Sequence, residues 1–299
     1  MMANANLQAQ FHKLCRLDRT GSFSTKRTYR QAMGQFLDYC SDNFHTMNIN
    51  RLGDKHIRAF VQIQLDRGVG QRTLQKQVAA IKHFLLIAGV RITVTNSQLG
   101  IAGRSYQVLQ GATNSEYQRI QIFCAQRGKV FEGLAVKTMY FFGLRSNEVV
   151  NLHYGTLRDA MRTGKLLIEH GTKGGRKRTL ELTAQQMSVA RELEVSRLNP
   201  DGHTESDKVF CSRQKDSVKK QYWRLHNFFS HYGEKMSDEG RTDTLSCHSF
   251  RRAFAQNLYD ICRKKGNSPE QAMRRVKTAL GHSEKRGVDV TGVYVCNKW

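Results

Sequence analysis

Residues 245–255, LSCHSFRRAFA, carry the most specific pattern in this chain. His248 and Arg251 stand one helical turn apart, so both side chains project from the same face of a helix. Phe250 and Phe254 are expected to anchor that helix in an apolar core while the other two residues face an anion. A histidine at a helix cap beside a surface arginine is the ordinary interpretation of the short His-x-x-Arg pattern. The longer sequence HSFRRAFA is more specific than the His-x-x-Arg pattern alone.

A second arginine stands upstream, in FFGLRSNEVVNL (residues 141–152). Arg145 ends an apolar stretch, where a lone arginine is ordinarily a surface or salt-bridge residue. Glu148 follows three residues later and is expected to orient the fold or an arginine rather than to act as a catalyst. In the downstream segment Arg252 competes with Arg251, but the three-residue spacing after the histidine selects Arg251.

A basic hairpin is predicted between these two segments. KLLIE (165–169) and RTLEL (178–182) flank GTKGGRK and predict two strands joined by a turn that contains glycine. A solvated turn is the ordinary interpretation of such a tip. A phosphate-binding P-loop is excluded because the pattern GxxxxGK[ST] is absent. Lys173 and Lys177 both stand on the tip, and a flexible tip could present either one.

The C-terminal region supplies a histidine and a tyrosine. His282 lies in ALGHSEK and Tyr294 lies in TGVYV. Taken alone, such a histidine would ordinarily be structural. Tyr232 and Tyr259 compete with Tyr294, but they lie on apolar stripes and are expected to be core residues.

In their order along the chain and in their local sequence, these segments resemble the tyrosine recombinase (phage integrase) family, whose members cut and rejoin DNA through a tyrosine. The resemblance is strong over residues 131–299 and weaker over the N-terminal third. It makes Tyr294 the nucleophile and Lys173 the general acid, with Lys177 as the alternative. The intervals on both sides of His282 are longer than is usual in the family. The catalytic residues that the resemblance implies are Arg145, Lys173, His248, Arg251, His282 and Tyr294.

These residue types suit the cleavage of a phosphodiester without a cofactor or a divalent metal. Guanidinium groups are permanently charged and bind two phosphate oxygens at once. A free tyrosine has a pKa of about 10 and needs help from its surroundings to become a nucleophile. Lysine can protonate the departing 5′ oxygen, and histidine can move protons near neutral pH. A 3′-phosphotyrosyl ester would store the bond energy, so ATP is not implied.

The charge balance independently indicates a nucleic-acid partner. The chain holds 48 Lys and Arg against 25 Asp and Glu, a net charge of +23. Residues 1–110 hold 15 basic and 5 acidic residues, and the remainder holds 33 and 20. Two basic parts suit a protein that grips one polyanion from two sides. A solvated basic surface is the alternative, because charge alone says nothing about chemistry.

Several other protein classes do not fit the sequence. No run of about 18 apolar residues predicts a membrane span, and the N-terminus lacks the apolar core of a signal peptide. The seven cysteines are scattered without a CxxC pair, which favours reduced thiols and a cytoplasmic protein.

Helical periodicity predicts a small bundle ahead of the catalytic segment. Apolar residues recur at helical spacing after Ser24, which is the predicted N-cap, and again after Asp54 and around Leu74. Residues 91–112 are polar and contain glycine, so they are predicted to form a linker. The bundle resembles the family's SAM-like core-binding domain, which clamps one side of the duplex.

The expected fold is mainly α with a small β element. It comprises a helical core-binding domain followed by a mixed α/β tyrosine-recombinase catalytic domain. The expected boundaries are 1–22 for an N-terminal tail, 23–110 for the core-binding domain and 111–299 for the catalytic domain.

The expected function is that of a site-specific DNA recombinase, an integrase that inserts and excises a mobile element. The resemblance also implies a homotetramer on two double-stranded DNA sites, which exchanges strands through a four-way junction. An accessory DNA-bending protein is a further candidate partner. A type IB topoisomerase, which uses a similar residue set as a monomer, is the alternative enzyme. A DNA-binding factor that has lost cleavage is the alternative outside enzymes.

Overall fold

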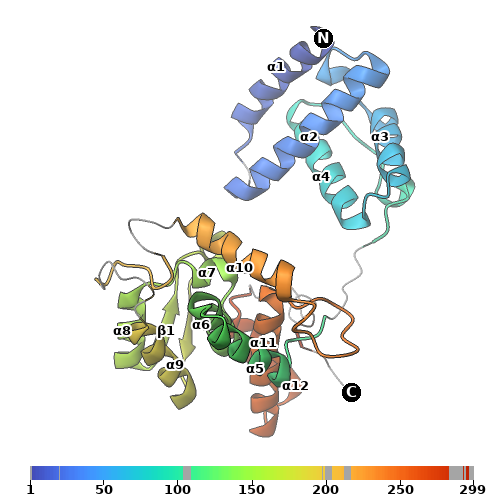
Figure 1. The fold of residues 1–299 in the computed structure, drawn as a ribbon. Coiled ribbons are helices and arrows are strands. Elements are labelled where there is room, and N and C mark those ends of the chain that lie inside the picture. Colours follow the sequence, from blue (N-terminus) through green and yellow to red (C-terminus); the bar gives the residue numbers. More distant parts are fainter. Residues whose placement is uncertain are drawn as a thin grey trace. The chain divides into compact units, whose positions relative to one another are not determined.

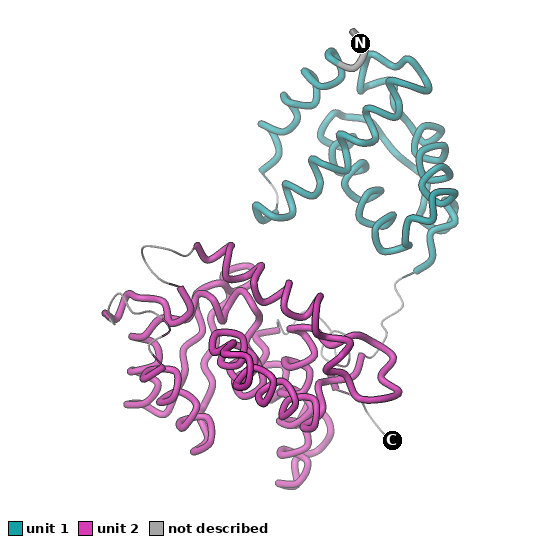
Figure 2. Tube along the Cα trace, viewed as in Figure 1, with its two compact units in different colours: residues 1–105 teal, residues 106–299 magenta. Residues whose placement is uncertain are grey.

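The chain folds into two compact units, residues 1–105 and 106–299, each with its own apolar core (Figure 2). The computed structural model describes residues 2–19, 21–103, 109–196, 198, 204–211, 217–282, 292 and 294–295. No helix within these ranges is both long and apolar enough to cross a membrane.

The N-terminal unit is a bundle of helices (Figure 1). Its core includes Phe36 and Phe60, whose rings meet edge to face with centroids 5.5 Å apart. The predicted apolar stripes therefore form one core, as helical spacing requires. The elements are α1 (Met2–Leu17), α2 (Phe23–Phe44), η1 (Ile49–Arg51), α3 (Asp54–Asp66), α4 (Gln71–Ile87) and η2 (Ser97–Leu99).

The start of the chain differs from the prediction of a tail over residues 1–22. Helix α1 buries Leu7 and Phe11 in the core of the bundle, and the Phe11 ring meets the Phe84 ring at 5.0 Å. Leu14 and Cys15 are partly buried against the same core, so the apolar residues of α1 follow a helical spacing. The N-cap of α2 is Ser22 rather than the predicted Ser24.

The predicted linker at 91–112 is divided between the two units. Val94, Leu99 and Ile101 are buried in the core of the N-terminal unit, whereas Ala112 belongs to the core of the second. These apolar residues are isolated and follow no helical period, so their burial left no recognisable pattern in the sequence. The region between residues 103 and 109 lies outside the described ranges.

The second unit is mostly helical and contains one two-stranded antiparallel sheet, in which Leu166 pairs with Leu180. The predicted class, mainly α with a small β element, is confirmed. Helices α5, α7, α8 and α9 were not predicted. The elements are α5 (Asn114–Gln126), α6 (Val130–Phe142), α7 (Ser146–Val149), α8 (Tyr154–Thr163), β1 (Lys165–Ile168), η3 (Lys173–Gly175), β2 (Arg178–Glu181), α9 (Ala184–Val195), α10 (Val218–Tyr232), α11 (Cys247–Lys264) and α12 (Pro269–Ala279).

Helices α6 and α11 pack together and bring the two arginine segments side by side (Figure 1). Phe250 and Phe254 of α11 are buried, as predicted. Gly143 ends α6 with a φ of +62°, and a Cβ there would lie 2.2 Å from a ring carbon of Phe254. Only glycine fits this turn, because the conformation is left-handed and the space is already filled. The turn leads directly into Arg145.

Candidate active site

Glu148 is the centre of a cluster of arginines. It is fully buried and accepts hydrogen bonds from Arg145 Nη1 (2.7 Å) and from both Nη atoms of Arg178 (2.8 and 2.6 Å). Arg251 Nη1 lies 3.7 Å from Glu148 Oε2. Burial raises the pKa of Glu148, but the hydrogen bonds and charge of Arg178 and the charges of Arg251 and Arg145 outweigh burial and hold the pKa at about 2. The carboxylate is therefore ionised and orients the arginines, as predicted.

Arg251 is completely buried on α11. Its Nη1 donates to Gly143 O, and its Nη2 donates to Leu280 O at 2.6 Å. Burial, followed by the charge of Arg145, lowers the pKa of Arg251 to about 9, so the guanidinium still carries its charge at neutral pH. Its Nε is buried without a hydrogen-bond partner among the described residues. A buried donor without a partner is costly, and Arg178 Nε is a second such donor in the same cluster.

His248 stands one turn before Arg251 on α11 and is exposed at the surface. Its neighbours nevertheless desolvate the ring, and the charges of Arg251, Arg252 and Arg145 act in the same direction. Together they lower the pKa of His248 to about 4. The ring is therefore neutral at neutral pH.

His282 and Tyr294 lie together beside Arg251. The rings of His282 and Tyr294 have centroids 5.2 Å apart, and Arg251 Cζ lies 5.8 Å from the centroid of the tyrosine ring. Gly281 has a φ of +66°, and a Cβ there would lie 2.9 Å from Arg178 Cδ, so this glycine leaves room for the arginine. The intervals around His282 are long, yet the three functional groups meet.

The first residue of the turn of the predicted hairpin, Gly171, is fastened to α7. Asn147 Nδ2 donates to Gly171 O at 2.8 Å, and a Cβ at Gly171 would lie 2.3 Å from Asn147 O. Lys177 Nζ forms an ion pair with Glu169 at 2.7 Å. Lys173 is exposed and has no ion-pair partner within the described part of the chain. The turn that carries Lys173 is therefore held at Gly171 by Asn147, which lies two residues after Arg145.

Two contributors to the site were missed in the sequence. Arg178 was assigned only to a basic hairpin strand, but its side chain is 4% exposed and bound to Glu148. The signal was strand alternation: Arg178 lies two residues before Leu180 and faces the same buried side of β2. His226 of α10 shares a hydrogen bond of 3.2 Å with Ser146 Oγ, and no sequence pattern pointed to that contact.

The competing residues lie elsewhere. Arg252 is turned away from the cluster and donates to Gln110 O and Asp243 Oδ2. Tyr259 is 8% exposed in the core, and the Tyr232 ring packs against the ring of Phe123 at 4.9 Å. The geometry thus separates these three residues from the arginines around Glu148.

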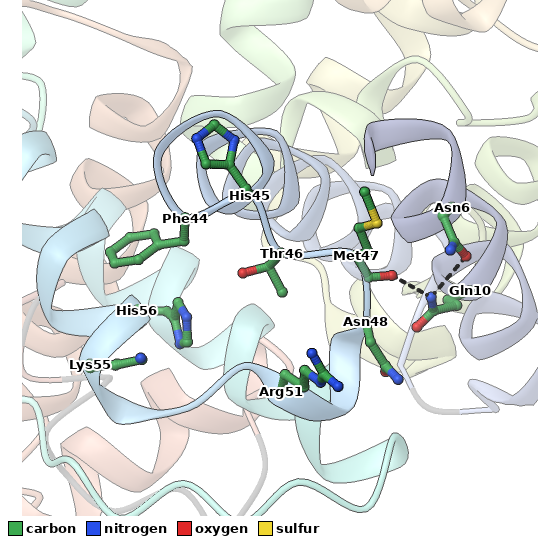
Figure 3. Close-up of a pocket in the computed structure, with 10 residues that line it drawn as sticks. All are labelled: Asn6, Gln10, Phe44, His45, Thr46, Met47, Asn48, Arg51, Lys55 and His56. Carbon is green, nitrogen blue, oxygen red and sulfur yellow. Dashed lines mark hydrogen bonds between the residues drawn. The ribbon is translucent and has the colours of Figure 1, made fainter. Parts of the chain in front are cut away.

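A pocket of about 520 Å³ in the N-terminal unit lies outside this cluster (Figure 3). It is formed by α1, the loop that follows α2 and the start of α3. Gln10 Nε2 spans one side of it and donates to Asn6 Oδ1 (3.0 Å) and Met47 O (2.8 Å). The pocket contains none of the predicted catalytic residues. In the described ranges, no three His, Cys, Asp or Glu residues come together as a metal site.

Two family profiles cover most of the sequence. The profile described as "Phage integrase family" matches residues 112–293, and the one described as "Phage integrase, N-terminal" matches residues 4–94. The chain belongs to the phage integrase family. The first match includes the whole arginine cluster and ends one residue before Tyr294.

Individual relatives of this integrase-family chain are distant. Tyrosine recombinase XerD of Oceanobacillus iheyensis is 22% identical over 296 residues, which cover 95% of this chain and 91% of XerD. The Tn1549 transposon integrase, solved in complex with transposon right end DNA, matches with a TM-score of 0.68 at 13% identity, covering 100% of this chain and 96% of that one. A lambda integrase tetramer bound to a Holliday junction matches with a TM-score of 0.66 at 15% identity, covering 95% of this chain and 76% of that one.

Family membership and the XerD relative make this integrase-family protein a site-specific recombinase of the tyrosine class, as the sequence predicted. The structural matches show the same fold over nearly the whole chain. The topoisomerase and the non-catalytic binding factor are not favoured.

Proposed function

We propose that this protein cleaves double-stranded DNA by attack of the Tyr294 hydroxyl on a phosphorus atom held by Arg145 and Arg251. The observation that carries the proposal is the position of Arg251 between Glu148 and Tyr294. Its Cζ atom lies 5.8 Å from the centroid of the tyrosine ring, and its Nε is a buried donor that no other described residue binds. That donor is proposed to bind a non-bridging phosphate oxygen.

The charge of the cluster supports a phosphate ligand. Arg145, Arg178 and Arg251 carry three positive charges, and Glu148 offsets one of them. The excess positive charge lies in a largely buried site, where it interacts strongly with the negative charge that develops on phosphorus during the attack. No cofactor or divalent metal enters the proposed reaction.

The proposed reaction exchanges one phosphate ester for another. The bond between the Tyr294 oxygen and phosphorus forms while the bond between phosphorus and the 5′ oxygen breaks. The tyrosine loses its hydroxyl proton, and the departing 5′ oxygen gains one. Neutral His248 and His282 are proposed to bind the phosphate, and His282, whose ring centroid lies 5.2 Å from that of Tyr294, is proposed to take up the tyrosine proton. The reverse reaction, with a 5′-hydroxyl from a second strand as nucleophile, completes the exchange.

Lys173 is the proposed general acid for the 5′ oxygen. Lys177 is the sequence alternative, but its ammonium group is held by Glu169 at 2.7 Å. Lys173 is exposed on the same tip, two residues beyond the anchored Gly171. A free ammonium on a short tether is better suited to reach a departing oxygen than one already engaged by a carboxylate.

The proposed substrate is duplex DNA bound as part of a homotetramer on two sites. Solved relatives in complex with transposon DNA and with a Holliday junction support this assembly. The integrase family profile supports the integration and excision of a mobile element as the biological reaction. An accessory DNA-bending protein and a cytoplasmic location are proposed with it.

The decisive experiment traps the covalent intermediate. A nicked duplex, from which the 5′ product strand diffuses away, is incubated with the wild-type protein or Tyr294→Phe in EDTA and run on a denaturing gel. The wild-type protein should give a protein–DNA adduct, whereas Tyr294→Phe should bind the same DNA without forming one. An adduct in the Phe variant would move the nucleophile elsewhere, and an adduct that requires Mg²⁺ would refute the metal-free reaction.

A further inference from the structure

The first described residues of the second unit run directly against the helix that carries His248 and Arg251. Ala112 N donates to Ser249 O of α11 at 2.8 Å. Ser249 is fully buried, next to His248 in the sequence and two residues before Arg251. This backbone bond therefore acts on the turn from which both proposed catalytic side chains project.

Two arginines bind the same carbonyl group in this segment. Arg252 Nε donates to Gln110 O at 3.1 Å, and Arg241 Nη2 donates to the same oxygen at 2.8 Å. Each guanidinium is also paired with a carboxylate, Arg252 with Asp243 (2.9 Å) and Arg241 with buried Glu116 (2.8 Å). Planar guanidinium groups held on two sides have little freedom, so Gln110 O is held in one position.

Gly111 brings two stretches of backbone into direct contact. A Cβ on this residue would lie 2.8 Å from Ala253 N and 3.0 Å from Ala253 Cα. Those are main-chain atoms of α11, which cannot move aside as a flexible side chain would. Arg241 Nη1 also donates to Gly111 O at 3.2 Å. The segment cannot shift without displacing α11 at the residue that follows Arg252.

We propose that Arg252 is a positioning residue for the recombination reaction. It fastens Gln110, Gly111 and Ala112, here named the linker anchor, to the first turns of α11. The anchor thereby fixes the orientation in which α11 presents His248 and Arg251 to the phosphate. The inference rests on the proposed cleavage by Tyr294. Displacements of about 1 Å can cost about 100-fold in rate, so an anchor built from backbone contacts is stiff enough to matter.

Arg252 also acts on His248 through its charge. It is one of the positive charges that add to desolvation in lowering the pKa of His248. A variant that loses this charge should raise that pKa, whereas a variant that keeps the charge but loses the geometry should not. The two contributions of Arg252 can therefore be measured separately.

The test compares Arg252→Lys and Arg252→Gln with the wild-type protein in single-turnover cleavage of the nicked duplex at saturating protein. Lysine keeps the charge for Asp243 but cannot reproduce the divergent donors to Gln110 O and Ser249 Oγ. We expect the cleavage rate of Arg252→Lys to fall about 10- to 100-fold with DNA affinity unchanged, and Arg252→Gln to fall at least as far. The NMR titration of His248 should shift upward only in Arg252→Gln.

Arg263→Gln is the matched control, because Arg263 lies on the same helix, is exposed and donates to the carbonyl oxygen of Asn267. It should cleave at the wild-type rate. A folded Arg252→Lys protein that cleaves at the wild-type rate would overturn the proposal, as would an equal loss in Arg263→Gln. Thermal unfolding confirms that each protein is folded. If the wild-type protein forms no adduct, the proposed function fails; if it does and Arg252→Lys is unaffected, only the positioning role fails.

Discussion

Arg178 and Glu148 form a two-point ion pair beneath the candidate site, with Nη1 to Oε1 at 2.8 Å and Nη2 to Oε2 at 2.6 Å. Both side chains are almost fully buried. The pair joins strand β2 to α7, so the basic hairpin and the first arginine segment form one structural piece. Arg145 and Arg251 then share the same carboxylate from other directions.

Replacing Arg178 with Gln should destabilise the second unit. Glu148 keeps its hydrogen bond from Arg145 but loses both hydrogen bonds from Arg178, and breaking a buried ion pair typically costs about 3–5 kcal/mol. Urea unfolding would measure the change in the free energy of unfolding. Arg162→Gln is the control, since Arg162 is 77% exposed in its pair with Asp159 and should leave stability unchanged. Equal stability of Arg178→Gln and the wild-type protein would contradict the proposed support of Glu148.

Replacing Arg251 with Lys should remove cleavage while DNA binding persists. Lysine keeps a positive charge but lacks the several fixed donors that reach Gly143 O, Leu280 O and a phosphate oxygen together. Loss of one such transition-state donor costs about 100- to 1,000-fold in rate. Adduct formation is followed under single-turnover conditions, and DNA affinity is measured separately by filter binding. A lysine variant that cleaves at nearly the wild-type rate would remove Arg251 from the reaction.

Replacing Lys173 with Ala should slow cleavage of ordinary DNA but spare a substrate with sulfur in place of the bridging 5′ oxygen. A thiolate leaves without needing a proton, so the general acid becomes dispensable. Lys177→Ala serves as the comparison, because Lys177 is paired with Glu169. The ratio of its cleavage rates on the two substrates should equal that of the wild-type protein. Rescue of Lys177→Ala instead would transfer the acid role to that residue.

The His248 ring should titrate near pH 4 in the folded protein, against an ordinary value of 6.5. Because the folded-state pKa is lowered, protonation favours the unfolded chain. Stability associated with this residue is therefore full above pH 6.5 and declines as pH falls from 6.5 through 4. NMR of the ring protons measures the pKa directly. The free energy of unfolding of His248→Asn should lack this part of the pH dependence; if the two proteins show parallel pH profiles, His248 is not neutral in the folded state.

The sequence was most informative where chemistry and periodicity coincide. Phe250 and Phe254 share a helical spacing with His248 and Arg251, so one pattern predicted both the packing and the functional face of α11. The roles of individual site residues remain predictions until variants such as Tyr294→Phe are measured.

The sequence was least informative where single residues act through distant partners. Arg178 looks like one more basic residue in RKR, and only the burial of its neighbour Leu180 distinguishes it. Leu7, Phe11 and Leu14 follow a helical spacing over only two turns, among polar residues, so the helix α1 that they dock was not recognised. Gly111 has an ordinary backbone conformation. Only the tertiary contact with Ala253 shows that a side chain at this position would not fit. Such contacts depend on the tertiary fold, and local sequence does not encode them.

The contact between Asn147 and Gly171 limits the reach of the general acid. Lys173 follows Gly171 by two residues, so its Cα can travel no more than about 7 Å from that fixed point. The lysine can therefore search only a small shell of space, whatever duplex is present. A strand whose 5′ oxygen lies beyond the combined length of this tether and the lysine side chain would be bound but stay uncut. The length of the tether would then select correctly placed DNA at the cleavage step, after binding.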